Sequence, residues 1–186
     1  HELRNPLAPA VNAVQGLEKL GATREQQKLL AIAGRQLAQL TRLVGDLMDA
    51  SRIGSGRVEL QLETICVSET VERAVQTVRH MFEDRGQEIA VSLPSSPICI
   101  RADAARIEQV IVNLLINAAK YTEDNGRISV NVEQQGDECT VRVRDTGIGI
   151  SPALLPRIFD LFSQAAPGLD RSKGGLGIGL ALVKRL

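Results

Sequence analysis

The first quarter of the chain has the apolar spacing of two amphipathic helices. Apolar residues recur in steps of three and four over 3–21 and again over 30–47, which is the period of a helix seam. Between the two stretches, Gly21 suits a helix C-terminus and Thr23 suits the N-cap of the next helix. One helical hairpin cannot cover both stripes, so the pattern predicts that two copies pair as a four-helix bundle, which makes the protein a homodimer.

The pattern changes after residue 57 to a mixture of strands and helices. The segment "IGSGR" at 53–57 is interpreted as a linker because it is rich in Gly and Ser. Periodicity then predicts strands at 57–67, 87–93 and 98–103, a strand–turn–strand unit at 127–145, and helices at 69–84, from Asp103 to about Tyr121, and from about Gly179. The predicted fold class is α+β, with a hairpin domain at 1–52 and, at 58–186, a sandwich of an antiparallel or mixed sheet with helices on one face.

Composition excludes several classes of protein. Hydrophobic residues make up 44% of the 186-residue chain, enough for a buried core, and the 22 basic residues balance the 22 acidic ones. A balanced charge argues against a nucleic-acid partner. No apolar run approaches the roughly 20 residues of a membrane span, so no membrane segment is expected in this chain. Cys66, Cys99 and Cys139 lack metal-ligand spacing, and an odd count is a poor disulfide framework, so three reduced thiols in a cytoplasmic protein are expected.

Two glycine-rich segments are candidates for ligand binding. In "DTGIGI" (145–150), Asp145 follows a predicted strand, and its carboxylate suits an exocyclic amine such as that of adenine, while glycines let the backbone approach a ligand. In "GGLGIGL" (174–180), the segment runs into a helix whose N-terminus can hold phosphate oxygens. Its spacing is neither a dinucleotide fingerprint nor a P-loop. Taken singly, the first is also consistent with an ordinary turn and the second with a flexible loop.

The segment "NLLINAAKYT" (113–122) places polar side chains inside an apolar helix. Asn113 and Asn117 are four residues apart on one face, and Lys120 is one turn from Asn117. A buried amide is costly unless it is hydrogen-bonded, so capping or solvation explains this pair poorly. Two amides and a cation together suit a phosphate with bound Mg²⁺, and the ring of Tyr121 suits a nucleotide base.

Taken together and in order, these segments resemble the sensor histidine kinases of two-component systems. The start "HELRNPL" resembles the family's phosphoacceptor box, and the segment at 113–122 resembles its N box. The segments at 145–150 and 174–180 resemble its two glycine boxes, and "IFDLFSQ" (158–164) lies where the family has a phenylalanine box. The resemblance covers nearly the whole chain. It implies a dimeric helical hairpin joined to a Bergerat-type ATP-binding sandwich.

The resemblance assigns roles to the first residues. It implies that His1 takes the γ-phosphoryl group of ATP, and that Glu2 orients the ring and accepts its proton. Asn5 takes the position that helps some members dephosphorylate their partner. Pro6, which the family shares, is interpreted as bending the first helix below His1, and Pro9 is an extra proline seen in a subset of hybrid kinases.

The resemblance also assigns the nucleotide site. Asn117 is expected to bind Mg²⁺, Asn113 to support the triphosphate, Lys120 to contact phosphate, and Tyr121 to contact adenine. The residues 151–176 are expected to form a mobile lid. The remaining nucleotide-binding residues implied are Asp145, Gly147 and Gly149 at the adenine, Gly175, Gly177 and Gly179 at the phosphates, and Arg171 and Lys173 of the lid at the γ-phosphate. For the two lid cations, a solvated basic pair is an equally good interpretation.

The function implied is an autophosphorylating protein-histidine kinase that passes its phosphoryl group to an aspartate of a response-regulator receiver domain. ATP and Mg²⁺ are the cofactors implied. Two alternatives stay open: another ATPase of the superfamily shared with gyrase and heat-shock chaperones, or a non-catalytic signalling scaffold. In the family, further strands follow the last helix and close the sheet, so those strands are expected to be missing after "ALVKRL".

Overall fold

The computed structural model describes residues 60–161, 163 and 177–186, together with scattered positions between 10 and 48. The chain divides into two compact units, His1–Arg57 and Val58–Leu186. The predicted linker at 53–57 lies outside the described residues. Among those residues, no helix is long and apolar enough to cross a membrane.

In the unit His1–Arg57, the described positions confirm that Thr23 is a helix N-cap. The Thr23 Oγ1 accepts a hydrogen bond from the backbone N–H of Gln26 at 3.4 Å, and Gln26 Oε1 accepts one from the Thr23 N–H at 2.9 Å. This reciprocal pair is a capping box, which satisfies two N–H groups that the first helical turn leaves without partners. Every described position from Arg24 to Met48 is helical, as the periodicity predicts.

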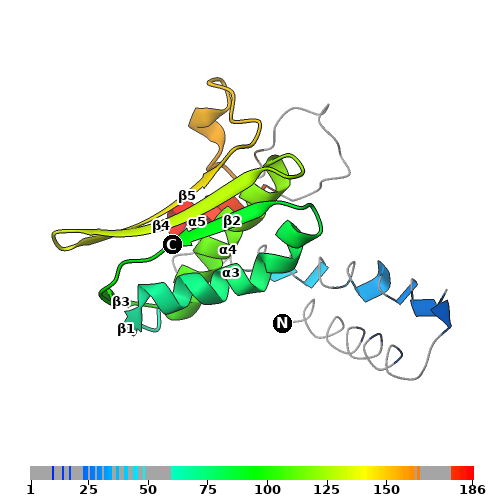
Figure 1. Ribbon diagram of the computed structural model, residues 1–186, viewed down its shortest axis with the longest axis horizontal. Coiled ribbons are helices and arrows are strands. Elements are labelled where there is room, and N and C mark those ends of the chain that lie inside the picture. Colours follow the sequence, from blue (N-terminus) through cyan, green and yellow to red (C-terminus); the bar gives the residue numbers. More distant parts are fainter. Residues whose placement is uncertain are drawn as a thin grey trace. The chain divides into compact units, whose positions relative to one another are not determined.

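The unit Val58–Leu186 is an α+β fold with two sheets (Figure 1). A three-stranded sheet has the order β2-β4-β5, in which β2 runs parallel to β4 and β4 runs antiparallel to β5. A separate antiparallel pair joins β1 and β3. The elements are β1 (Glu63–Cys66), α3 (Val67–Glu83), β2 (Glu88–Ser92), β3 (Cys99–Ala102), α4 (Ala104–Tyr121), β4 (Arg127–Gln135), β5 (Glu138–Asp145), the 3-10 helix η1 (Leu155–Arg157) and α5 (Gly179–Arg185).

The predicted elements of this unit are confirmed in type, and one strand is shorter than expected. Alternation predicts a strand over 57–67, whereas β1 occupies only Glu63–Cys66. Its partner β3 explains the difference. The register pairs Glu63 with Ala102, the last residue of β3. The next residue, Asp103, is the N-cap of α4 and continues no ladder, so the described residues 60–62 have no strand to pair with.

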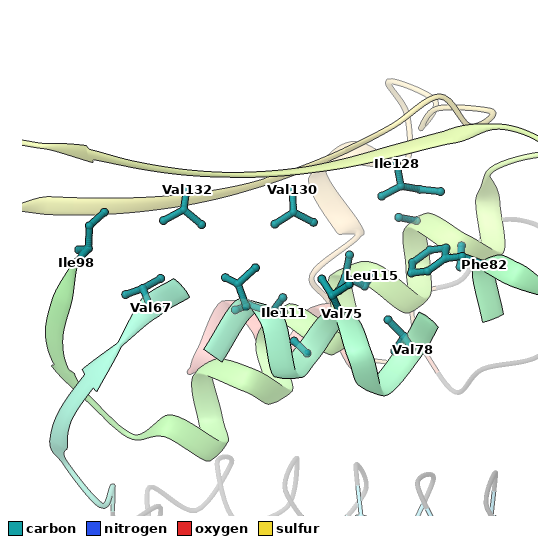
Figure 2. Packing of buried hydrophobic residues seen from close by; sticks show 14 residues of the cluster. Val67, Val75, Val78, Phe82, Ile98, Ile111, Leu115, Ile128, Val130 and Val132 are labelled. Atoms are coloured by element: carbon teal, nitrogen blue, oxygen red, sulfur yellow. The ribbon is translucent and has the colours of Figure 1, made fainter. Parts of the chain in front are cut away.

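The core lies between one face of the three-stranded sheet and two helices. Figure 2 shows Ile128, Val130 and Val132 of β4 pointing toward the helices, as alternation along a half-buried strand requires. The facing side chains, all buried, are Val67, Val71, Ala74, Val75, Val78 and Phe82 of α3 and Ile111, Leu115, Ala118 and Ala119 of α4. Each fully buried aliphatic side chain of this kind stabilises the fold by about 1.5–3 kcal/mol. Helices therefore cover one face of the sheet, as predicted.

Asp103 fixes the beginning of α4. Its Oδ1 accepts a hydrogen bond from the backbone N–H of Arg106 at 3.1 Å, which is the N-cap bond that the sequence predicts. Its Oδ2 accepts another from the N–H of Gln61 at 3.0 Å. The Gln61 N–H is the largest cause that lowers the pKa of Asp103 below its usual value, with the Arg106 N–H adding to it. One carboxylate thus joins the chain segment before β1 to the first turn of α4.

The end of α4 is held by side chains from the turn between α3 and β2. Buried Gln87 donates from Nε2 to the carbonyl oxygens of Ala119 at 3.0 Å and Thr122 at 2.9 Å. Arg85 donates to the Ala119 carbonyl as well, and its Nε lies 2.9 Å from a carboxylate oxygen of Asp124. The last carbonyls of a helix have no partner within the helix, so these bonds fix where α4 stops.

The charge on Asp103 predicts how the stability of this unit depends on pH. Because its folded pKa is lowered, Asp103 stabilises the fold above its unfolded pKa of about 3.9, and this contribution is lost as pH falls through the lower folded value. We expect Asp103→Ala to lower the free energy of unfolding by about 1 kcal/mol at pH 7. The gap between wild type and the variant should shrink below roughly pH 4. Urea unfolding followed by circular dichroism at pH 7 and pH 3 measures it.

Asp103→Asn is the matched control. An asparagine still accepts from the Arg106 N–H but carries no charge and presents an N–H₂ group toward Gln61, so its stability should not follow this titration. A gap between wild type and Asp103→Ala that stays constant from pH 7 to pH 3 would contradict the assignment.

Candidate functional site

Part of the predicted site lies outside the described residues. These residues are His1, Glu2 and Asn5 of the expected phosphoacceptor segment and Arg171, Lys173 and Gly175 of the expected lid. Their roles stay predictions. The other predicted residues all lie in the unit Val58–Leu186, and the structure shows which of them come together.

Three segments that are far apart in the sequence meet around the C-terminal half of α4. The side chain of Asn113 faces the start of α5, where a Cβ built on Gly179 would lie 3.5 Å from Asn113 Oδ1. At the end of the helix, the backbone N–H of Ile148 donates to the carbonyl of Tyr121 at 3.2 Å. The N-box segment therefore contacts both glycine-rich segments, as the resemblance implies.

The side-chain amide nitrogen of Asn113 is a buried hydrogen-bond donor at the centre of this region. Its Nδ2 is buried, and among the described residues no group accepts a hydrogen bond from it. An unpaired buried N–H₂ group costs about 1–3 kcal/mol, so a native structure that keeps one usually has a use for it. Asn117 lies one turn further along the same helix and is half-buried. These amides fit a ligand that brings oxygen acceptors.

The end of α4 presents a cation and a ring together. Lys120 Nζ lies 4.7 Å from the centroid of the Tyr121 ring, within the range of a cation–π interaction. The Tyr121 side chain is 40% exposed. The predicted phosphate contact and the predicted base contact are therefore adjacent, and the ring remains accessible to a planar ligand.

Asp145 ends β5 and begins the turn of the first glycine-rich segment. Its Oδ1 accepts a hydrogen bond from the backbone N–H of Gly147 at 2.8 Å, and the residue is exposed. The turn is fixed further by Thr146, whose Oγ1 accepts from the Arg127 N–H and whose own N–H donates to the Arg127 carbonyl, both at 3.0 Å. One carboxylate oxygen therefore shapes the turn, and the side chain is open to a hydrogen-bond donor of a ligand.

The two glycines of this turn are needed for different reasons. A Cβ at Gly147 would lie 2.8 Å from the carbonyl carbon of Tyr121 and 2.7 Å from Asp145 Oδ1, which is closer than Cβ atoms approach. Gly149 has open space around it but a φ of +69°, which side chains disfavour. The sequence predicts that Gly147 and Gly149 admit a ligand. In the structure, Gly147 admits the protein's own Tyr121 carbonyl.

Phe159, from the segment at 158–164, lies near a side chain of the last helix. Lys184 Nζ of α5 is 5.8 Å from the centroid of the Phe159 ring, whose side chain is 39% exposed. This contact places Phe159 of the predicted phenylalanine box near a side chain of the helix that follows the second glycine-rich segment.

Three residues that hold the site in place have no signal in the sequence. Gln87, Arg85 and Thr146 bond to partners 19 to 39 residues away, so no local pattern identifies them.

The chemistry of the described residues limits how a metal ion is bound. Within them, no group of three or more His, Cys, Asp or Glu side chains is placed to hold a metal. A hard cation at Asn117 would therefore take most of its oxygen ligands from a phosphate and water, which is the usual coordination of Mg²⁺ with nucleotides.

Comparison with known families identifies the chain. Residues 102–186 match the family described as histidine kinase-, DNA gyrase B-, and HSP90-like ATPase, and residues 1–56 match the His Kinase A (phospho-acceptor) domain. The first match alone leaves gyrases and chaperones possible, and the second separates them from kinases. The chain belongs to the sensor histidine kinases.

Several histidine kinases are similar over the whole of this chain. It is 32% identical over 192 residues to the signal transduction histidine-protein kinase BarA of Escherichia coli and 31% identical over 192 residues to the hybrid signal transduction histidine kinase L of Dictyostelium discoideum. It spans 21% and 11% of their lengths. The solved structure of full-length ShkA in complex with AMPPNP aligns with all of this chain and 38% of its own, at 28% identity and a TM-score of 0.75.

The close contact at Gly147 couples the stability of the fold to the geometry of the site. Gly147→Ala forces the Asp145 turn away from the Tyr121 carbonyl, and overpacking of this kind costs about 1–3 kcal/mol. We expect a lower free energy of unfolding and at least about a tenfold loss of affinity for an ATP analogue, equivalent to about 1.4 kcal/mol. Urea unfolding and calorimetric titration measure the two effects.

Gly136→Asn is the matched control for this variant. Gly136 lies in the turn between β4 and β5, has a φ of +61° and has open space around it, and asparagine tolerates that conformation better than other side chains. This variant should bind the analogue like wild type. Equal binding by Gly147→Ala and wild type would show that the contact with Tyr121 does not position the site.

Proposed function

We propose that the chain is an ATP-dependent protein-histidine kinase that phosphorylates His1 and then transfers the phosphoryl group to an aspartate of a response-regulator receiver domain. The observation that carries the nucleotide site is the buried Nδ2 of Asn113, which has no hydrogen-bond partner among the described residues and lies where the N box meets the start of α5. Two observations support ATP as the nucleotide. The chain matches the two family models, and the similar structure of ShkA is a complex with AMPPNP, an analogue of ATP.

In this proposal the unit Val58–Leu186 binds ATP. Tyr121 and Asp145 contact adenine, the ring by stacking and the carboxylate by accepting from the exocyclic amine. Asn113 and Lys120 donate to the phosphates, and the N-terminal end of α5 faces them. Asn117 is the protein ligand of Mg²⁺, which when bound offsets the charge of the phosphates.

Residues of the predicted first helix then take part in transfer of the γ-phosphoryl group. A ring nitrogen of neutral His1 attacks the γ-phosphorus, a nitrogen–phosphorus bond forms, and the bond from the γ-phosphorus to the bridging oxygen breaks, so ADP leaves. Glu2 orients the ring and accepts the proton of the other ring nitrogen. An imidazole with an ordinary pKa near 6.5 is largely neutral at pH 7 and able to attack.

In this proposal the chain forms a homodimer through the unit His1–Arg57. Large apolar side chains at described helical positions are left exposed within one chain: Leu17 at 51%, Leu29 at 62%, Ile32 at 48% and Leu40 at 48%. Covering this apolar surface is favourable by about 25 cal/mol per Å². A second copy of the hairpin, packed as a four-helix bundle, covers it.

The second transfer follows from the phosphoacceptor domain. A phosphohistidine is a high-energy donor, and an aspartate of a receiver domain is its acceptor in this family. Asn5 stands four residues after His1 in the sequence, the position that helps some members of the family dephosphorylate their partner, and the proposal gives it that role in hydrolysis of the aspartyl phosphate.

Incubation with γ-labelled ATP and Mg²⁺ tests the kinase activity. We expect label on the protein that is acid-labile and base-stable, as a phosphohistidine is, and none on His1→Gln. His80→Gln is the matched control, because His80, the only other histidine, lies exposed in the last turn of α3 and should leave labelling unchanged. Phosphate release without labelled protein would favour an ATPase of the gyrase and chaperone type. Absence of both, with no ATP binding, would favour a scaffold.

Asn113→Leu separates binding from folding. Replacing an unpaired buried amide by an apolar side chain of similar size should leave the free energy of unfolding unchanged or raise it by about 1 kcal/mol. ATP affinity should fall by roughly 10- to 100-fold, since hydrogen bonds to charged groups are worth about 1.5–3 kcal/mol. Thermal unfolding and calorimetric titration measure both quantities.

Asn131→Leu is the control, because Asn131 is a half-buried amide on the sheet face opposite the core. It should bind ATP like wild type. An Asn113→Leu protein that is markedly destabilised, or that binds ATP normally, would show that the amide serves the fold rather than the nucleotide.

A further inference from the structure

Two of the three cysteines lie opposite each other in the small sheet. The antiparallel register of β1 and β3 pairs Cys66 with Cys99, the last partners of the ladder. Both are free thiols. The odd number of cysteines leads us to expect three reduced thiols from the sequence, and no local pattern reports the strand register that pairs these two.

The hydrogen bonding next to this pair fixes its geometry. The backbone N–H of Val67 donates to the carbonyl of Ile98 at 3.0 Å, so these two opposite residues form a hydrogen-bonded pair. Such pairs alternate along an antiparallel ladder. Cys66 and Cys99 are therefore a non-hydrogen-bonded pair, in which the Cα atoms are about 4.5 Å apart and the side chains are closest. Disulfides span Cα separations of about 4.4–6.8 Å.

The two thiols share the accessible face of the small sheet. Ile65 and Val67 of this segment are buried, and so is Ile98 opposite Val67. Because side chains alternate between faces, Cys66 and Cys99 point away from that core. Cys99 is exposed and Cys66 is half-buried. No hydrogen bond within the described residues caps α3 from the Cys66 side chain, although Cys66 is its N-cap residue.

We propose that Cys66 and Cys99 form a reversible cross-strand disulfide, with a low-molecular-weight disulfide as the oxidant. The thiolate of exposed Cys99 attacks one sulfur of the oxidant, which forms a mixed disulfide and releases one thiol. Cys66 then attacks the Cys99 sulfur, which forms the protein disulfide and releases the second thiol. The two protons of the protein thiols leave with the reduced oxidant. Because Cys99 is exposed, the disulfide is accessible to reducing agents, and exposed disulfides are more readily reduced than buried structural ones.

The third cysteine does not take part. Cys139 lies on β5, opposite Gln134 in the register, and burial raises the pKa of its thiol, which lowers its reactivity at neutral pH. Cys139 is therefore the internal control. Its oxidation together with the other two would show that the oxidant reacts with thiols in general and not with the paired cysteines.

Equilibration of the full chain with excess oxidised glutathione tests the proposal. The reaction is quenched with acid, free thiols are alkylated, and tryptic peptides are identified by mass spectrometry. Cys66, Cys99 and Cys139 fall in separate tryptic peptides, 58–73, 86–101 and 128–142. We expect 58–73 linked to 86–101 within one chain, with 128–142 alkylated. The midpoint of thermal unfolding should rise by roughly 5–10 °C, and dithiothreitol should reverse the rise.

Single-site variants separate this pairing from other thiol chemistry. Cys66→Ser and Cys99→Ser should each abolish the linked peptide and the rise in the midpoint, whereas Cys139→Ser should retain both. The proposal is overturned by any of three results: Cys66 and Cys99 stay alkylatable, Cys99 stops at the mixed disulfide with glutathione, or the linked peptides join two chains or include Cys139. ATP-dependent labelling does not enter this readout, so the disulfide stands or fails independently of the kinase activity.

Discussion

The structure of the nucleotide-binding unit depends on how α4 is held at both ends. At its start, Asp103 caps the first turn and also binds the Gln61 N–H. At its end, Gln87 donates from Nε2 to the carbonyl oxygens of Ala119 and Thr122, so the helix stops at a fixed residue. A helix free to shift by one residue would rotate its side chains by about 100°. That rotation would exchange the core-facing residues with those that face the ligand.

This constraint matters because α4 serves the core and the site at once. Ile111 and Leu115 pack under the sheet, while Asn113 faces α5 and Asn117 lies a turn beyond it. Burial of the apolar residues fixes the rotation of the helix, and the rotation then aims the amides. The buried Nδ2 of Asn113, which has no partner among the described residues, is a cost of this arrangement. A core that did not set the rotation could not keep an amide in that position.

The sequence predicts the features that depend on residues close together in the chain. Periodicity gives the helices and the β4–β5 unit, and capping chemistry gives Thr23 and Asp103 as helix starts. It does not give the parallel pairing of β2 with β4, because no turn joins those strands. For the same reason it misses the bonds of Gln87 and the pairing of Cys66 with Cys99. Both depend on strand and helix contacts between distant segments. Gly147 shows an intermediate case, since its need for close approach is predictable but its partner, the Tyr121 carbonyl, is not.

The position of Asp145 shows how such a distant contact is enforced. In the β4–β5 register, Asp145 lies opposite Ile128, whose side chain is fully buried under the sheet. A slip of the hairpin by one residue would move every buried residue of β4 or β5 to the wrong face. The burial of Ile128, Val130 and Val132 thus opposes the slip. Because the register is fixed, the turn after Asp145 lies at the end of α4. There the bond from the Ile148 N–H to the Tyr121 carbonyl joins the two segments through backbone atoms. Because no side chain makes that bond, it tolerates substitution at Tyr121 and, proline excepted, at Ile148, while the close approach of the Tyr121 carbonyl requires a residue without a Cβ at position 147.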